Sequence, residues 1–234
     1  MQLRRSAKAA AIWSSDVESI AKLVKEQESA RGDFPGPLPV IYYGSISDAN
    51  VVKKVVDGGV TAVVADYGQS LDETVTSVLS DVGIIWRVSS LAEMNELMTT
   101  TDNDMGDVIL LSKDILPASV DDDDTSSSDE LAETLSSNKS VVTIAQLQSM
   151  MPANAEIPLG KHLSKLGVSS LVLQEACVGD EEDVKYTTYA VEELNKKSSS
   201  TFSITGLTGS TNGHFGVSSH GGEVKWRRNN AESK

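Results

Sequence analysis

The sequence predicts an α/β protein in which short strands alternate with helices. From Leu38 onward, apolar runs alternate with stretches of helical periodicity, so that each pair forms one strand and one helix. Each expected strand is a nearly unbroken apolar run, which is typical of a parallel sheet whose faces are both covered. The residues are 39% hydrophobic but only 5% aromatic, which favours a core of aliphatic side chains.

The N-terminal part, residues 1–37, is expected to be one helix and a linker. Apolar residues recur on one face of Asp16–Ala30, and Ser15 or Asp16 is suited to cap the helix. Gly32–Pro39 is rich in Gly and Pro and breaks the chain. Met1–Ser15 carries three basic residues among Ala and Ser, which resembles the end of an organellar transit peptide, although a frayed terminus explains it better.

The main domain is expected over residues 38–197. Its six predicted strands are Val40–Tyr43, Thr61–Ala65, Gly83–Val88, Asp107–Leu111, Ser140–Ile144 and Ser170–Leu173. Its predicted helices are Asp48–Asp57, Leu71–Leu79, Leu91–Met98, Asp129–Leu135, Leu159–Leu166 and Glu181–Lys196. An acidic and serine-rich insertion at 119–128 lacks the ligand spacing of a calcium loop, so a solvated loop is the favoured interpretation.

The tail, residues 198–234, is rich in Gly, Ser, Thr and Asn and shows no core periodicity. Thr201–Leu207 is the one stretch in it that could add a strand. Near its end, Lys225, Trp226, Arg227 and Arg228 form a basic patch that we expect either to bind a partner or to remain exposed.

Charge and composition exclude several classes of function. The formal net charge of -14 opposes binding to nucleic acids and to anionic membrane surfaces. No apolar run reaches the roughly 20 residues of a membrane-spanning helix, so we expect a soluble protein without membrane insertion. The protein could still bind at the periphery of a membrane complex. The single cysteine excludes an intramolecular disulfide, and with the scattered histidines it predicts no metal site and no cofactor.

Several local motifs follow one another in a recognisable order. They are Pro39-Val40-Ile41, the run from Gly58 to Val64, the segment Val88–Met94, Lys113-Asp114-Ile115, and the run Leu166–Leu173. In this order and spacing they resemble indole-3-glycerol-phosphate synthase, a (β/α)8 barrel of the tryptophan pathway, from its third strand to its last helix. The resemblance implies an incomplete or degenerate TIM barrel of about six to seven strands with a Gly/Ser-rich C-terminal extension.

The resemblance also places the catalytic positions of the family on Tyr43, Arg87, Leu111, Ile144 and Ala145. A tyrosine replaces the lysine acid, and its phenol, with a pKa of about 10, is a poor substitute. An arginine replaces the glutamate of the fifth strand and cannot act as a base. The other three positions are apolar and can neither donate nor accept a hydrogen bond. The resemblance therefore implies a pseudoenzyme related to a carboxy-lyase, with no catalytic residue retained.

A residual ligand site is expected at the strand ends, at Ser112, Lys113, Gln174 and Glu175. The glycines that expose backbone amides to a phosphate in the family correspond here to Gln146 and Gln174, which weakens phosphate binding. A phosphate bound near Ser112, Lys113 and Gln174 would favour an enzyme whose site has moved.

Two functions follow from these observations. The first is a non-catalytic structural or accessory subunit that docks on the protein subunits of a larger assembly through its open sheet edge and basic tail. The second is an enzyme or binding protein for a phosphorylated small molecule, such as a synthase-like lyase with a relocated site. Because tryptophan-pathway barrels of algae and plants reside in plastids, the resemblance and the transit-like start imply a chloroplast protein; the alternative is a soluble intracellular protein.

Overall fold

The computed structural model describes residues 9–33, 36–100, 108–117, 125–137, 141–176 and 181–196. It contains all six predicted strands and one more before them. The strands are β1 (Ile12–Ser14), β2 (Val40–Tyr42), β3 (Ala62–Asp66), β4 (Gly83–Val88), β5 (Val108–Leu111), β6 (Val142–Gln148) and β7 (Ser170–Gln174). The helices are α2 (Val17–Glu28), α3 (Ala49–Asp57), α4 (Glu73–Val78), α5 (Leu91–Thr100), α6 (Thr125–Ser137), α7 (Glu156–Leu166) and α8 (Glu181–Asn195), with a short 3-10 helix, η1 (Pro152–Asn154), before α7.

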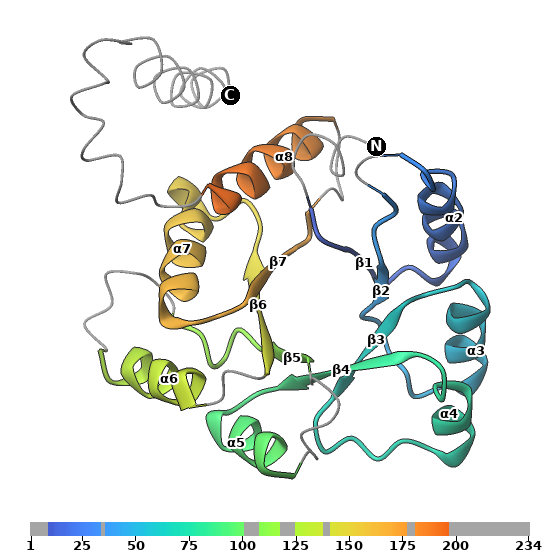
Figure 1. Ribbon diagram of the computed structural model, residues 1–234, viewed down its shortest axis with the longest axis horizontal. Coiled ribbons are helices and arrows are strands. Elements are labelled where there is room, and N and C mark those ends of the chain that lie inside the picture. Colours follow the sequence, from blue (N-terminus) through green and yellow to red (C-terminus); the bar gives the residue numbers. More distant parts are fainter. Residues whose placement is uncertain are drawn as a thin grey trace. The chain divides into compact units, whose positions relative to one another are not determined.

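The seven strands form one parallel sheet in sequential order, β1 to β7. Figure 1 shows this sheet curling around a central axis, with the helices on its outer side. Each of the helices α2 to α7 lies between one strand and the next, as a parallel sheet requires, and α8 follows the last strand. The predicted fold class is therefore confirmed: the described chain is an incomplete TIM-barrel-like fold, a curled half-barrel of β/α units.

β1 is the element that the sequence did not predict, because its three residues lie in a segment expected to fray. Its backbone is nevertheless held on β2, where Ile12, Trp13 and Ser14 are in register with Val40, Ile41 and Tyr42. The backbone N–H of Ile12 donates to the Pro39 carbonyl at 3.0 Å, and the N–H of Tyr43 donates to the Ser14 carbonyl at 3.2 Å. The helix predicted at Asp16–Ala30 thus follows a strand and completes the first β/α unit.

The strand register defines an inner face. Trp13 pairs with Ile41, Ile41 with Ala62 and Ala62 with Gly83, so these residues form one layer across four strands. Side chains of a strand alternate between its two faces, so every second residue points inward. The inner cluster is aliphatic and consists of Ile41, Ala62, Val64, Ile85, Leu110 and Ile144, with Trp13, Tyr43, Val108 and Val172 packed against it.

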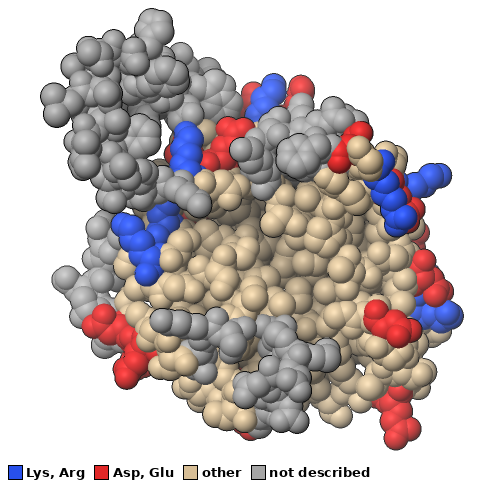
Figure 2. All heavy atoms as spheres, viewed as in Figure 1, with Lys and Arg blue, Asp and Glu red and all other residues tan. Residues whose placement is uncertain are grey.

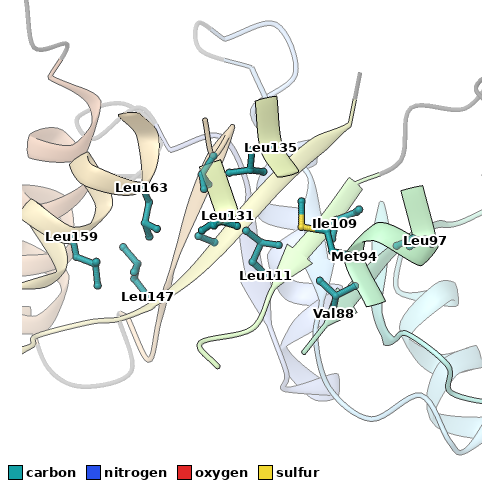
Figure 3. Close-up of a cluster of buried hydrophobic side chains, with 12 residues drawn as sticks. Val88, Met94, Leu97, Ile109, Leu111, Leu131, Leu135, Leu147, Leu159 and Leu163 are labelled. Atoms are coloured by element: carbon teal, nitrogen blue, oxygen red, sulfur yellow. The ribbon is translucent and has the colours of Figure 1, made fainter. Parts of the chain in front are cut away.

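The outer face carries most of the buried apolar residues. One cluster joins β2 and β3 to α2, α3 and α4, and a second joins β4 to β7 with α5, α6 and α7. Figure 3 shows the second cluster, in which Leu111 on β5 points toward side chains of the helices. Leu111, Leu131 and Leu163 are completely buried in it. The aliphatic core that the composition predicts is therefore mainly a sheet-to-helix interface.

Local signals set the ends of several helices. Asp16, Asp48 and Asp72 each cap a helix by accepting a hydrogen bond from the backbone N–H two residues later. Gly167 ends α7 with φ 112°, a conformation that glycine adopts without strain. α6 begins at Thr125, four residues before its predicted start, so the last part of the expected insertion at 119–128 is helical.

The tail 198–234 lies outside the described residues, and with it Thr201–Leu207 and the patch of Lys225, Trp226, Arg227 and Arg228. None of the helices in the described ranges has the length and apolar character needed to cross a membrane.

Candidate functional site

A cavity of about 670 Å³ lies where the carboxyl ends of the strands meet. Its deeper wall contains Val64, Leu110 and Val172 from the inner face of the sheet, and it extends along β1 to side chains of α2. The polar lining residues come mainly from strand ends and the loops after them: Ser14, Ser15, Asp16, Glu26, Gln27, Tyr43, Arg87, Gln146, Gln174 and Glu175. Parallel strands point the same way, so residues far apart in the sequence meet here.

Arg87, near the end of β4, is held by a carboxylate of the neighbouring strand. Asp66 is its register partner on β3, and the Arg87 Nε donates to the Asp66 Oδ1 at 2.5 Å. This hydrogen bond, reinforced by the opposite charge, raises the pKa of Arg87 above its usual value, although partial burial acts in the other direction. Both side chains are partly exposed, so the pair adds little stability, and its main effect is to orient the guanidinium.

Glu175 follows β7 directly and has an unusual backbone. Its φ is 56°, in the left-handed region that costs a residue with a Cβ about 1–2 kcal/mol. Its carboxylate is held from β6, because the Gln148 Nε2 donates to the Glu175 Oε2 at 2.7 Å. A strained residue with an oriented carboxylate beside a cavity is the arrangement often found at functional sites.

The wall on the side of β1 is formed by the first β/α unit. Asp16 lies at the start of α2, where hydrogen bonds from the Ser19 hydroxyl and the Glu18 N–H lower the pKa of its carboxyl group. Gln27, on the inner side of α2, is buried, and its Oε1 accepts from the backbone N–H of Leu38 at 3.1 Å. This hydrogen bond ties α2 to the chain entering β2 and shapes the cavity there.

The structure brings together four of the residues that the sequence selected: Tyr43, Arg87, Gln174 and Glu175 all line the cavity. Gln146, predicted to replace a phosphate-binding glycine, lines it too. Ser112 and Lys113 do not, and the Ser112 hydroxyl instead donates to the Asp114 carboxylate at 2.9 Å.

Three of the predicted former catalytic positions do not line the cavity. Leu111 and Ala145 belong to the outer cluster and face the helices. Ile144 points inward but is packed among the aliphatic residues below the cavity. The assignment of these positions by resemblance stays a prediction; neighbouring residues of a strand face opposite sides, so Leu111 and Ala145 point away from the cavity. The inward residues of these two strands that line the cavity are Leu110 on β5 and Gln146 on β6.

Sequence reasoning missed Trp13, Asp66 and Gln148. Trp13 is absent from the predicted set because β1 was not expected. Asp66 and Gln148 are the polar residues that end β3 and β6, one residue beyond the predicted end at Ala65 and four residues beyond the predicted end at Ile144. The predicted end of β6 at Ile144 removed Gln146 and Gln148 from the sheet, although both face the same side as Ile144.

The chemical character of the site is set by few groups. Among the described lining residues, the carboxylates are Asp16, Glu26 and Glu175, and the cation is Arg87. The amides of Gln146 and Gln174 can each donate and accept hydrogen bonds. Within the described ranges, no three His, Cys, Asp or Glu side chains are arranged to hold a metal ion. Figure 2 shows one face of the molecule, on which the charged side chains of the described residues lie mostly at the periphery.

Comparison with known proteins supports the fold. No protein-family model matches the chain, and no curated protein sequence matches it significantly. Among solved structures, a thiamine phosphate pyrophosphorylase from Pyrococcus furiosus superposes with a TM-score of 0.51 at 16% identity, covering 83% of this chain and 86% of that chain.

Two further structures are less similar. An HpcH/HpaI aldolase from Desulfitobacterium hafniense DCB-2 gives a TM-score of 0.47 at 12% identity, covering 83% of this chain and 88% of that one. A 7,8-dihydropteroate synthase from Vibrio fischeri ES114 gives 0.46 at 10% identity, with 76% and 68% covered. At these identities the likeness concerns the fold alone. The finer resemblance to indole-3-glycerol-phosphate synthase stays a prediction, whereas the TIM-barrel-like architecture is established.

Proposed function

We propose that this protein binds a small molecule in the cavity at the carboxyl ends of its strands, as an enzyme or a binding protein. The observation that carries the proposal is the position of the cavity, because TIM-barrel enzymes build their active sites at this end of the sheet. A volume of about 670 Å³ is within the range of small-molecule sites. The lining combines apolar walls with a few convergent polar groups, which is the usual composition of such sites.

A phosphorylated ligand, expected as one alternative from the sequence, receives little support. Lys113 lies outside the cavity lining, and Arg87 already pairs with Asp66. In many barrels the phosphate lies near a helix N-terminus beyond the last strands. Here the first turn of α8 carries Glu181, Glu182 and Asp183, and these carboxylates would repel an anion.

The proposal is tested by screening small molecules against the full-length protein and a variant with a filled cavity. Amines, carboxylates, sugars and phosphorylated compounds would be screened by ligand-observed NMR and thermal shift. In the variant, Val64→Trp and Val172→Trp place two large side chains in the cavity. Val142→Trp is the matched control, because Val142 is exposed at the amino end of β6. Compounds that bind the wild type and the control but not the filled variant support the proposal, and a panel without such a compound refutes it.

The alternative function, a non-catalytic subunit that docks on a larger assembly, remains a prediction. Its structural basis would be the outer edges of β1 and β7, the two strands that end the sheet in the described chain. The chloroplast location is likewise a prediction from the sequence.

A further inference from the structure

We infer that the ligand of the cavity is an uncharged ring compound with an amide group, such as a carboxamide or a lactam. This inference rests on the proposed function and specifies its ligand class. It is carried by two layers of side chains that the strand register builds at the carboxyl end of the sheet. One layer is apolar, and the other can form hydrogen bonds.

The apolar layer comes from the odd-numbered strands. In a TIM barrel each layer draws its side chains from alternate strands, and the stagger amounts to about one residue per strand. Counted in this way, the register leads from Trp13 on β1 to Val64 on β3, Leu110 on β5 and Val172 on β7. All four residues line the cavity, so they form an apolar surface on which the ring of a ligand can pack.

The hydrogen-bonding layer comes from the even-numbered strands. The same count leads from Tyr43, directly after β2, to Arg87 on β4 and Gln146 on β6. These three residues also line the cavity, about one residue nearer the carboxyl ends than the apolar layer. In Figure 1 β2, β4 and β6 lie at separate positions around the central axis. A ligand lying on the apolar layer is therefore met by polar groups from three strands.

The groups of this layer differ in what they can donate and accept. The Arg87 Nε donates to Asp66, which compensates the charge of the guanidinium, and its terminal N–H groups donate to no other described residue. Because a guanidinium cannot accept a hydrogen bond, Arg87 requires an acceptor on the ligand. The Gln146 amide and the Tyr43 hydroxyl can each donate and accept, and neither forms a hydrogen bond with another described residue.

An amide satisfies these groups better than a charged group does. Its carbonyl oxygen accepts from Arg87, and its N–H donates to the Gln146 Oε1. A carboxylate has no donor for Gln146 and meets a guanidinium whose charge Asp66 already compensates. An ammonium group has no acceptor for Arg87 and carries the same charge. Since a polar group left without a partner in the complex lowers the affinity, the layer selects the amide.

The test uses three probes with one phenyl ring: benzamide, benzoate and benzylamine. Their dissociation constants for the full chain would be measured by NMR titration at neutral pH, where the second is an anion and the third a cation. We expect benzamide to bind most tightly. Gln146→Met keeps the length of the side chain but removes both polar atoms, so it should weaken benzamide binding by about fivefold. Tyr43→Phe removes one hydroxyl and should weaken benzamide binding by about threefold.

Gln69→Met is the matched control, because Gln69 follows β3 at the same end of the sheet and does not line the cavity. This variant should bind all three probes as the wild type does, and the melting temperature of each variant checks that it is folded. Tighter binding of benzoate or benzylamine, no measurable binding of benzamide, or unchanged benzamide binding in Gln146→Met overturns the inference. Should Gln146→Met fail to fold, unchanged benzamide binding in Tyr43→Phe overturns it instead.

The filled-cavity variant separates this inference from the proposed function. If benzamide shows no preference but other compounds still bind the wild type and not the filled variant, the ligand class is wrong and the proposed function survives. If no compound distinguishes the wild type from the filled variant, the proposed function fails as well.

Discussion

The two faces of β5 provide the sharpest test of the structure. Leu110 and Leu111 are adjacent, and both are almost fully buried, at 3% and 0% exposure. Leu111 packs in the closed outer cluster, whereas Leu110 lines the cavity. Two single variants, Leu110→Ala and Leu111→Ala, should therefore lower the free energy of unfolding by different amounts, although the sequence offers no reason to distinguish the two leucines.

The expected magnitudes follow from the surroundings. Leu111→Ala removes buried methyl groups and leaves a void in a packed interface, which costs about 3–4 kcal/mol in the free energy of unfolding. Leu110→Ala enlarges a cavity that is already present, so it creates little new void. The loss in the free energy of unfolding then comes mainly from the buried apolar surface that is removed, and it is roughly 2 kcal/mol. For a chain of this size, the two variants should melt about 10 °C and about 6 °C below the wild type.

The assay is urea denaturation followed by circular dichroism, with thermal melts as a second measurement. Any compound found to bind in the cavity adds an independent measurement, because Leu110→Ala should change its affinity and Leu111→Ala should not. A larger loss of stability for Leu110→Ala, or altered binding only in Leu111→Ala, would mean that the inward and outward faces of β5 have been assigned the wrong way round.

Three further predictions concern single residues. Glu175→Gly should raise the stability by about 0.5–1 kcal/mol, because glycine relieves the φ of 56°, whereas Glu175→Ala keeps the strain and should give no gain in a thermal melt. Asp16→Ala should lower the melting temperature at neutral pH. Because the pKa of Asp16 is lowered in the folded state from 3.8, its contribution is present above that value and is lost as the pH falls through the folded pKa. Melts at pH about 7 and about 2.5 should therefore show the difference from wild type shrinking with acid, and a constant difference would contradict the reasoning. Gly167→Ala should cost about 1 kcal/mol through backbone strain at φ 112°, since the new Cβ would meet Leu135 at an ordinary 3.5 Å; an unchanged urea midpoint would contradict this.

Much of the fold was predictable because each β/α unit carries its own local signals. Helix α3 is amphipathic and capped, whereas β3 is an apolar run, so the two elements differ in periodicity. The glycines after α3 mark the end of the helix. The sequential strand order then follows, because neighbouring units pack beside each other. β1 escaped prediction because a strand of three residues has no measurable period, and its hydrogen bonds to β2 are formed only in the folded chain.

The site was less predictable than the fold. The family resemblance selects Arg87 and Glu175 and places both at strand ends. Their partners Asp66 and Gln148 come from adjacent strands, so the pairs depend on register, which no local pattern reports. The faces of β5 and β6 are equally hard to assign from the sequence, because a buried apolar run has no polar alternation that distinguishes its two faces.

The curled sheet begins and ends at strands that share a cavity but no backbone hydrogen bonds in the described chain. β1 pairs with β2, β7 pairs with β6, and the described pairing leaves the first and seventh strands separate. The three-residue β1 is therefore a region from which local unfolding can begin at low cost, exposing its amides to hydrogen exchange. A molecule in the cavity would contact Trp13 on one side and Val172 on the other. It would thus join two units that are distant in the chain, and its binding energy would appear as slower exchange at both ends of the sheet at once.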